Sequence, residues 1–70
     1  MNRLKELRLE RGLTVKELAN NISNSSANIS RYERGVTDPK LETWEKLAQY
    51  FDVDPEYLVG WSDVKRKNAQ

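Results

Sequence analysis

The fold is decided by residues 14–35, which read TVKELANNISNSSANISRYERG. Two short helical patterns lie in this stretch, and polar residues at positions 23–25 separate them. Thr14 and Glu17 have the spacing of a capping box, in which each side chain bonds the backbone N–H of the other. The apolar face of the first helix is formed by Leu18, Ala19 and Ile22. The stretch therefore predicts a helix, a short turn and a second helix.

The second helix of this pair is predicted to cover residues 26–34. Ser25 precedes it and belongs to the residue types that cap helix N-termini. Ile29 and Tyr32, three residues apart, form its inner face. Gly35 stops the helix, because glycine adopts the left-handed conformation with which many helices end.

Two further predicted helices flank the pair in the sequence. One covers residues 4–11 and ends at Gly12. The other covers residues 41–51 and has the clearest amphipathic stripe in the chain. The residues of that stripe are Leu41, Trp44, Leu47, Ala48 and Phe51.

A short last helix follows a break at residues 52–54. Asp54 is expected to cap it, and Pro55 suits its first position because proline has no N–H to leave unpaired there. Tyr57 and Leu58 face inward, and Gly60 ends the helix. The fold class is therefore all-α, with five helices and no strand.

The composition excludes several classes of protein. With 70 residues the chain suits a single domain, without room for a deep substrate cleft. It contains no cysteine and no histidine, so it lacks a disulfide framework, thiolate metal ligands and the commonest general base. We therefore expect no enzyme activity, no metal and no cofactor. The charged start and the lack of cysteine also predict a cytoplasmic protein that does not enter a membrane.

Charge is distributed unevenly along the chain. The net charge is +3 over residues 1–35, −5 over residues 36–64 and +3 over residues 65–70. A basic half beside an acidic half indicates a one-sided electrostatic surface, although chance gives such patterns in short chains. Residues 61–70 are expected to form a frayed, polar, basic tail or the start of a linker.

A helix-turn-helix of this length matches what reading of the DNA major groove requires. The groove is about 12 Å wide and admits one α-helix, and a preceding helix braces the reading helix against the backbone. The second helix must then present small or polar side chains outward near its start. The chain offers Ser26, Ala27, Asn28, Ser30 and Arg31 at these positions.

Four motifs in order carry a resemblance to a known family. They are LTxxELA from Leu13, ISRYExG from Ile29, PxLET from Pro39 and YLVG from Tyr57. Together they resemble the Cro/phage-repressor helix-turn-helix family, also called the xenobiotic-response-element type, over about residues 3–60. The resemblance implies a compact five-helix, lambda-repressor-like DNA-binding domain at residues 1–60, with the motif at about residues 14–34.

The resemblance also implies roles for single residues. The base-reading positions are Ser26, Ala27 and Arg31, with Asn28 beside them, and Arg31 is suited to guanine because a guanidinium can bond O6 and N7 together. The positions expected to contact phosphate or to orient the helix are Thr14, Lys16, Ser25, Ser30, Arg34, Lys40 and Leu41. For Ser25, a purely capping role is the favoured interpretation. Arg8 and Glu33 are expected to form an internal ion pair.

Three residues depart from the family pattern. Val15 stands where the family has glutamine, which removes one clamp to DNA. Ser23 stands where glycine adopts the left-handed conformation, and Asn24 replaces a small apolar residue. We therefore expect a looser turn, or one with a different angle.

The predicted function is a sequence-specific double-stranded DNA-binding regulator, most simply a repressor that binds a palindromic operator as a homodimer. Val59 and Trp61 either complete the core or form the dimer patch. The alternative is an antitoxin or adaptor of the same fold that acts on a protein partner, for which a large exposed apolar patch away from residues 26–34 would be the sign. The chain could also be the N-terminal part of a longer regulator.

Overall fold

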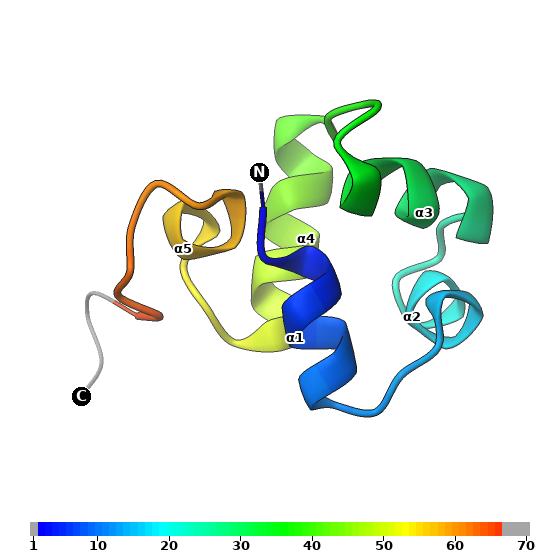
Figure 1. Ribbon diagram of the computed structural model, residues 1–70, viewed down its shortest axis with the longest axis horizontal. Coiled ribbons are helices and arrows are strands. Elements are labelled where there is room, and N and C mark those ends of the chain that lie inside the picture. Colours follow the sequence, from blue (N-terminus) through cyan, green and yellow to red (C-terminus); the bar gives the residue numbers. More distant parts are fainter. Residues whose placement is uncertain (1, 67–70) are drawn as a thin grey trace.

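The computed structural model describes residues 2–66, and this range contains five helices and no strand. They are α1 (Leu4–Glu10), α2 (Val15–Asn21), α3 (Ser26–Arg34), α4 (Leu41–Phe51) and α5 (Pro55–Val59) (Figure 1). The prediction of an all-α, five-helix domain is confirmed, and the helix bounds agree with the predicted ones to within about a residue.

The helices surround one apolar core. In Figure 1, α1 and α4 lie in the middle, α2 and α3 lie on one side and α5 lies on the other. Every helix contributes to the core, whose larger members are Leu4, Leu7, Leu18, Ile22, Ile29, Leu47, Phe51, Tyr57 and Leu58. Because α3 packs against both α2 and α1, its direction is fixed by two helices that precede it in the chain.

The helix pair begins and turns as the sequence predicts. Thr14 Oγ1 accepts a hydrogen bond from Glu17 N at 3.0 Å, and Thr14 N donates to Glu17 Oε1 at 2.9 Å, so the capping box is present. Ser23 has a φ of 56°, the left-handed conformation expected at this position. A serine there is strained, because its Cβ approaches the following carbonyl oxygen.

The amphipathic stripe of α4 is shorter than predicted. Leu47, Ala48 and Phe51 are buried, and Trp44 packs at the edge of the core. Leu41, however, is 72% exposed, so the prediction that it belongs to the stripe is wrong. The reason is its place in the first turn of α4, which extends beyond the core.

The ends of α4 and α5 differ from the sequence-based expectation in two details. Asp54 stands at the N-cap position of α5 with an extended backbone, but its side chain forms no cap hydrogen bond. Asp52 ends α4 in the left-handed conformation, with a φ of 57°. Aspartate is among the few non-glycine residues that adopt this conformation readily, but no glycine marks the position in the sequence.

A buried ion pair joins α1 to α3. The Arg8 guanidinium donates to both carboxylate oxygens of Glu33, at 2.7 Å from Nε and 3.1 Å from Nη2. The two side chains are only 10% and 7% exposed. A third donor atom, Arg8 Nη1, bonds the carbonyl oxygen of Leu13 at 2.7 Å. The pair expected from the family resemblance is thus present, and it also holds the loop that precedes α2.

The segment after α5 is attached to the domain as far as residue 66, so the expectation of a frayed tail is wrong for residues 61–66. Arg3 Nη1 donates to the carbonyl oxygen of Ser62 at 2.7 Å, and Arg3 Nη2 pairs with Asp63 at 2.6 Å. Further along, Asp54 N donates to the carbonyl oxygen of Lys65 at 2.6 Å. These bonds come from residues far away in the sequence, so no local pattern signals them. Residues 67–70 of the predicted tail lie outside the described residues.

Breaking the ion pair from one side is expected to destabilise the domain strongly. Glu33→Leu leaves the Arg8 guanidinium buried without its carboxylate, and we expect the free energy of unfolding to fall by about 3–5 kcal/mol. The double replacement Arg8→Met/Glu33→Leu should recover most of this loss, because it leaves no buried charge. Urea unfolding followed by circular dichroism measures both. A single variant as stable as the native chain would show that the pair is dispensable.

Relieving the strained turn is expected to stabilise the domain. Ser23→Gly removes a left-handed Cβ that costs roughly 1–2 kcal/mol, while the freer unfolded chain takes back part of the gain. We expect a net increase of about 0.5–1 kcal/mol in the free energy of unfolding. Ser23→Ala is the matched control, since it keeps the Cβ and should give no increase. Equal stability of the two variants would contradict the strain at this position.

Candidate nucleic-acid interface

One face of α3 points away from the domain. Its residues repeat at intervals of four, as side chains on one side of a helix do. They are Ser26, Ala27, Ser30, Arg31 and Arg34, of which all but the half-buried Ser30 are exposed. On the opposite side, Ile29 is fully buried and Glu33 bonds Arg8. The helix is therefore held by its inner face and leaves small and basic side chains outward.

The start of α3 is capped by Ser25. Its Oγ accepts a hydrogen bond from Asn28 N at 3.1 Å, and its backbone is extended. This is the capping role that the sequence favours for Ser25. Ser26 and Ala27 follow in the first turn, where a side chain can approach a base edge without a long reach.

Two arginines stand on the exposed face of α3. The Arg31 side chain is exposed, and its guanidinium forms no hydrogen bond or ion pair with any residue between 2 and 66. Arg34 Nε donates to the carbonyl oxygen of Ser30, one turn earlier, at a long 3.4 Å. The Arg31 guanidinium can therefore donate to an external acceptor without breaking a contact within the described domain.

The turn between α2 and α3 is held more firmly than expected. Asn24 N donates to the carbonyl oxygen of Ala19 at 2.8 Å. Its side-chain oxygen accepts from Ser25 N at 2.8 Å and from Asn28 Nδ2 at 3.0 Å. The expectation of a looser turn is therefore not met, because side-chain hydrogen bonds replace the apolar packing typical of the family at Asn24. An asparagine four residues before another asparagine was the sequence signal for this bond.

The N-termini of α2 and α4 differ in whether a side chain accepts hydrogen bonds from their first amides. At α2, the capping box already uses Thr14 and the Glu17 amide, and Lys16 is exposed beside it. At α4, the N-cap residue Lys40 forms no side-chain cap, and Leu41 begins the helix with an exposed side chain. Amides at the start of a helix favour an anion, and those of α4 have no side-chain acceptor among residues 2–66.

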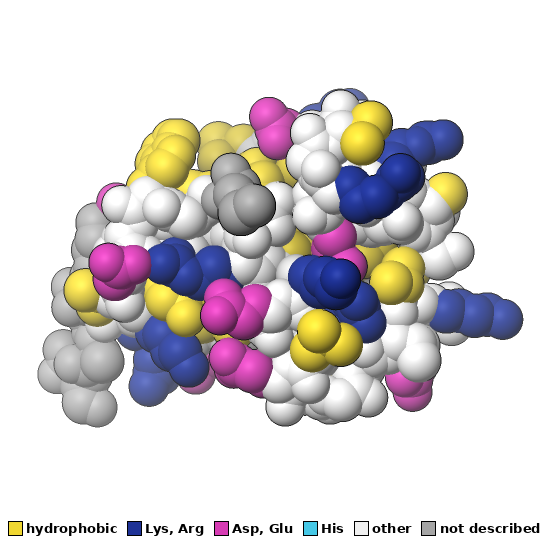
Figure 2. All heavy atoms as spheres, viewed as in Figure 1, with side chains coloured by type: hydrophobic (Ala, Val, Ile, Leu, Met, Phe, Trp, Pro, Cys, Tyr) yellow, Lys and Arg dark blue, Asp and Glu magenta, His cyan; other side chains and the backbone are white. Residues whose placement is uncertain are grey.

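The basic character of this region is visible on the surface. Figure 2 shows Lys and Arg side chains over α2 and α3. At the other end, the basic residues of the segment after α5 face acids: Arg66 pairs with Asp52 at 3.0 Å and Lys65 lies 3.9 Å from Glu10. The basic side chains on the exposed face of α3 have no acidic partner among residues 2–66, so they remain available to an anionic partner.

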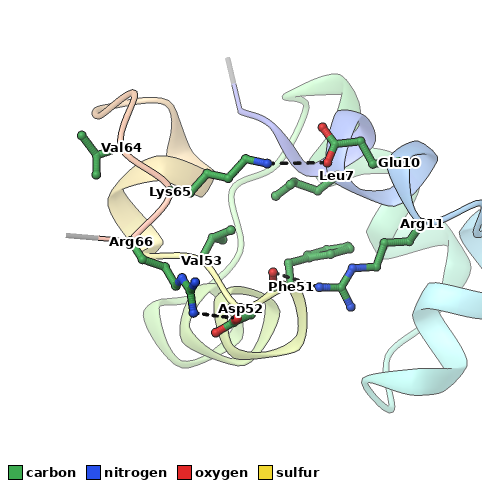
Figure 3. Close-up of a pocket in the computed structure, with 9 residues that line it drawn as sticks. All are labelled: Leu7, Glu10, Arg11, Phe51, Asp52, Val53, Val64, Lys65 and Arg66. Carbon is green, nitrogen blue, oxygen red and sulfur yellow. Dashed lines mark hydrogen bonds and ion pairs between the residues drawn. The ribbon is translucent and has the colours of Figure 1, made fainter. Parts of the chain in front are cut away.

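One hollow lies away from α3, and its charged side chains show no catalytic arrangement. It has a volume of about 390 Å³ and lies between α1, the end of α4 and residues 64–66 (Figure 3). Its charged side chains are engaged with one another or with backbone oxygens: Lys65 with Glu10, Arg66 with Asp52, and Arg11 with the carbonyl of Phe51 at 3.0 Å. Among residues 2–66, no group of acidic side chains could hold a metal ion, and no helix is long and apolar enough to cross a membrane.

A second hollow is apolar and lies between α4 and α5. It has a volume of about 280 Å³ and is lined by Leu41, Trp44, Pro55, Glu56, Val59 and Trp61. Trp61 is 84% exposed and Val59 is half-buried. One interpretation of the sequence placed both residues in the core, and the structure shows that neither of them completes it.

Known proteins with a helix-turn-helix domain are similar in sequence to this chain. A helix-turn-helix family model matches residues 4–58. The chain is 41% identical over 66 residues to the HTH-type transcriptional regulator ImmR of Bacillus subtilis (94% of this chain, 52% of that protein). It is 40% identical over 63 residues to the cryptic phage CTXphi transcriptional repressor RstR of Vibrio cholerae (90% and 57%). The HTH-type transcriptional regulator DdrOP3 of Deinococcus deserti is 45% identical over 57 residues (81% and 44%).

The matches cover the helical domain and leave part of each relative uncovered. The chain spans about half the length of the curated relatives that it matches first. No solved structure matches it.

Proposed function

The chain belongs to the Cro/phage-repressor helix-turn-helix family, and from this premise we propose that it is a DNA-binding transcriptional regulator, a repressor that reads the major groove of a specific duplex with α3. The observation that carries the proposal is the outward face of α3. It combines an arginine without a partner in the described domain with small side chains, on a helix whose inner face is buried. A protein that binds an operator must lie in the same compartment as the DNA. A cytoplasmic location therefore belongs to the same proposal.

The base-reading roles divide according to side-chain chemistry. Arg31 bonds guanine O6 and N7, which both accept and which a guanidinium can reach together. Ser26 donates to or accepts from either type of base edge, and Ala27 offers a methyl contact to thymine. Asn28 supplies an amide at the same end of the helix. Arg31 is the residue on which specificity depends most, because it is the longest and the strongest donor of the set.

The phosphate contacts orient α3 in the groove. The α4 N-terminus, with Lys40 and the Leu41 amide, approaches one strand. The start of α2, with Thr14 and Lys16, approaches the backbone on the other side of the groove. The polar groups of α3 beside these contacts complete the set: Ser25, Ser30 and Arg34. Such contacts supply affinity without sequence preference.

A second copy of the chain covers the apolar hollow between α4 and α5. Trp61 is exposed at its rim and Val59 is half-buried there, and an exposed apolar patch rimmed by polar residues indicates an interaction site. Two copies related by a twofold axis would bind two half-sites about one helical turn apart, which implies a palindromic operator. An antitoxin or adaptor would use the same surface for a different protein, so self-association decides between these functions.

Replacing the two arginines of α3 separates base reading from phosphate contact. The probe is the duplex enriched by the native chain from a random pool, together with its single-base-pair variants. Arg31→Ala should cost about 1–3 kcal/mol on the enriched duplex and abolish preference at one base pair. Arg34→Ala should weaken all duplexes equally and lower the salt dependence of binding by about one unit in slope. Equal weakening of all duplexes by Arg31→Ala would make Arg31 a phosphate contact. Failure of the native chain to enrich any duplex from the pool would refute the proposed function.

Removing the exposed tryptophan is expected to disrupt pairing of two copies. Trp61→Ser should weaken binding of the second copy to the palindromic duplex by about tenfold or more, because the burial of a large apolar side chain is lost. Sedimentation of the protein with and without the duplex measures this. Val64→Ser is the matched control, since Val64 is also exposed but lies outside this hollow. A native chain that binds the duplex only as a monomer would contradict the pairing.

A further inference from the structure

The side chain of Asn24 connects the turn to the first turn of α3. Its Oδ1 accepts two hydrogen bonds, from Ser25 N at 2.8 Å and from Asn28 Nδ2 at 3.0 Å. The bond to Ser25 is local, because it joins two neighbouring residues of the turn. The bond to Asn28 is different, because it joins the turn to a side chain at the proposed reading end of α3.

Asn28 is consequently held at two points. Its backbone N–H donates to Ser25 Oγ, and its side-chain nitrogen donates to Asn24 Oδ1. A primary amide has two N–H donors and one carbonyl acceptor. Because one N–H is used by Asn24, the groups that remain for a partner are the carbonyl oxygen Oδ1 and the second N–H. Asn28 is half-buried, and this restricts its side chain further.

This arrangement distinguishes a base edge from a phosphate as the partner of Asn28. A phosphate offers only acceptor oxygens, so it can accept from the second N–H of Asn28 but supplies no donor to the carbonyl oxygen. Adenine and cytosine each carry an amino group that donates in the major groove, and adenine also has an acceptor, N7, beside it. The groups left on Asn28 therefore complement an amino-bearing base edge.

We infer that Asn24 is a positioning residue that holds the Asn28 amide for recognition of an amino-bearing base, adenine or cytosine, at one operator position next to that read by Arg31. The inference rests on the proposed function. A side chain that is ordered before binding loses less conformational freedom when the duplex binds. Asn24 thereby contributes to specificity without contacting DNA.

A double-mutant cycle tests whether Asn24 acts through Asn28. The variants are Asn24→Ala, Asn28→Ala and the double variant, each titrated against the duplex enriched by the native chain and its single-base-pair replacements. Asn28→Ala should reduce discrimination at one base pair by about fivefold or more. Asn24→Ala should reduce discrimination at the same base pair, and the double variant should lose no more than Asn28→Ala alone. Preference at the base pair read by Arg31 should not change.

A conservative variant separates positioning from a general effect on the fold. Asn24→Asp keeps an acceptor oxygen for Ser25 N and Asn28 Nδ2 but adds a negative charge. It should bind all duplexes more weakly while keeping the native preference at the Asn28 base pair. Circular dichroism and thermal unfolding monitor folding of each variant. If Asn24→Ala does not fold, Asn24→Gln takes its place, since it keeps the amide and displaces its oxygen by one methylene.

The possible outcomes separate the inference from the proposed function. Equal weakening of all duplexes by Asn24→Ala, or a further loss of discrimination when it is added to Asn28→Ala, would overturn the positioning role while leaving the DNA-binding function intact. A preference of the native chain for guanine or thymine at the Asn28 position would overturn the chemistry inferred for the amide. A native chain that enriches no duplex would overturn the proposed function itself.

Discussion

The direction of α3 depends on the buried pair of Arg8 and Glu33. Glu33 lies on α3 itself, Arg8 lies on α1, and Arg8 Nη1 donates to the carbonyl oxygen of Leu13 in the loop before α2. One guanidinium thus joins α1 to the reading helix and to the loop that precedes α2. Removing two charges from water costs free energy that their attraction only partly returns, so the pair orients α3 more than it stabilises the domain. The apolar core supplies the stability, and the ion pair selects one arrangement of it.

The helices could be predicted because their signals are local. The capping box at Thr14, the glycine after α3 and the stripe of α4 all act within a few residues, and each of them is present. Leu41 was placed wrongly because a periodic pattern does not show where the core ends. The attachment of residues 61–66 was missed for a different reason. It depends on Arg3, about 60 positions earlier in the chain, and on backbone carbonyls that carry no sequence signature.

The candidate site was predictable in outline and not in its hydrogen bonds. The outward face of α3 follows from the helical repeat once Ile29 and Glu33 are placed inward. The effect of Asn24 did not follow, because a polar residue at a position that is apolar in the family suggests lost packing. In the structure, two hydrogen bonds that its side-chain oxygen accepts take the place of that packing. A turn can thus be fixed by polar contacts as well as by apolar ones, and only the three-dimensional arrangement shows which.

The two ends of the molecule differ in the use of their charges. Away from α3, several cations pair with acids, as in Arg66 with Asp52 and Arg3 with Asp63. On α3, Arg31 has no such partner among the described residues. A net charge of +1 therefore understates the attraction that this face exerts on an anion, because the acids that lower the net charge lie mostly elsewhere. Sequence recognition by so small a basic surface must rest on the geometry of a few side chains, and the bonds that hold those side chains are part of the reading mechanism.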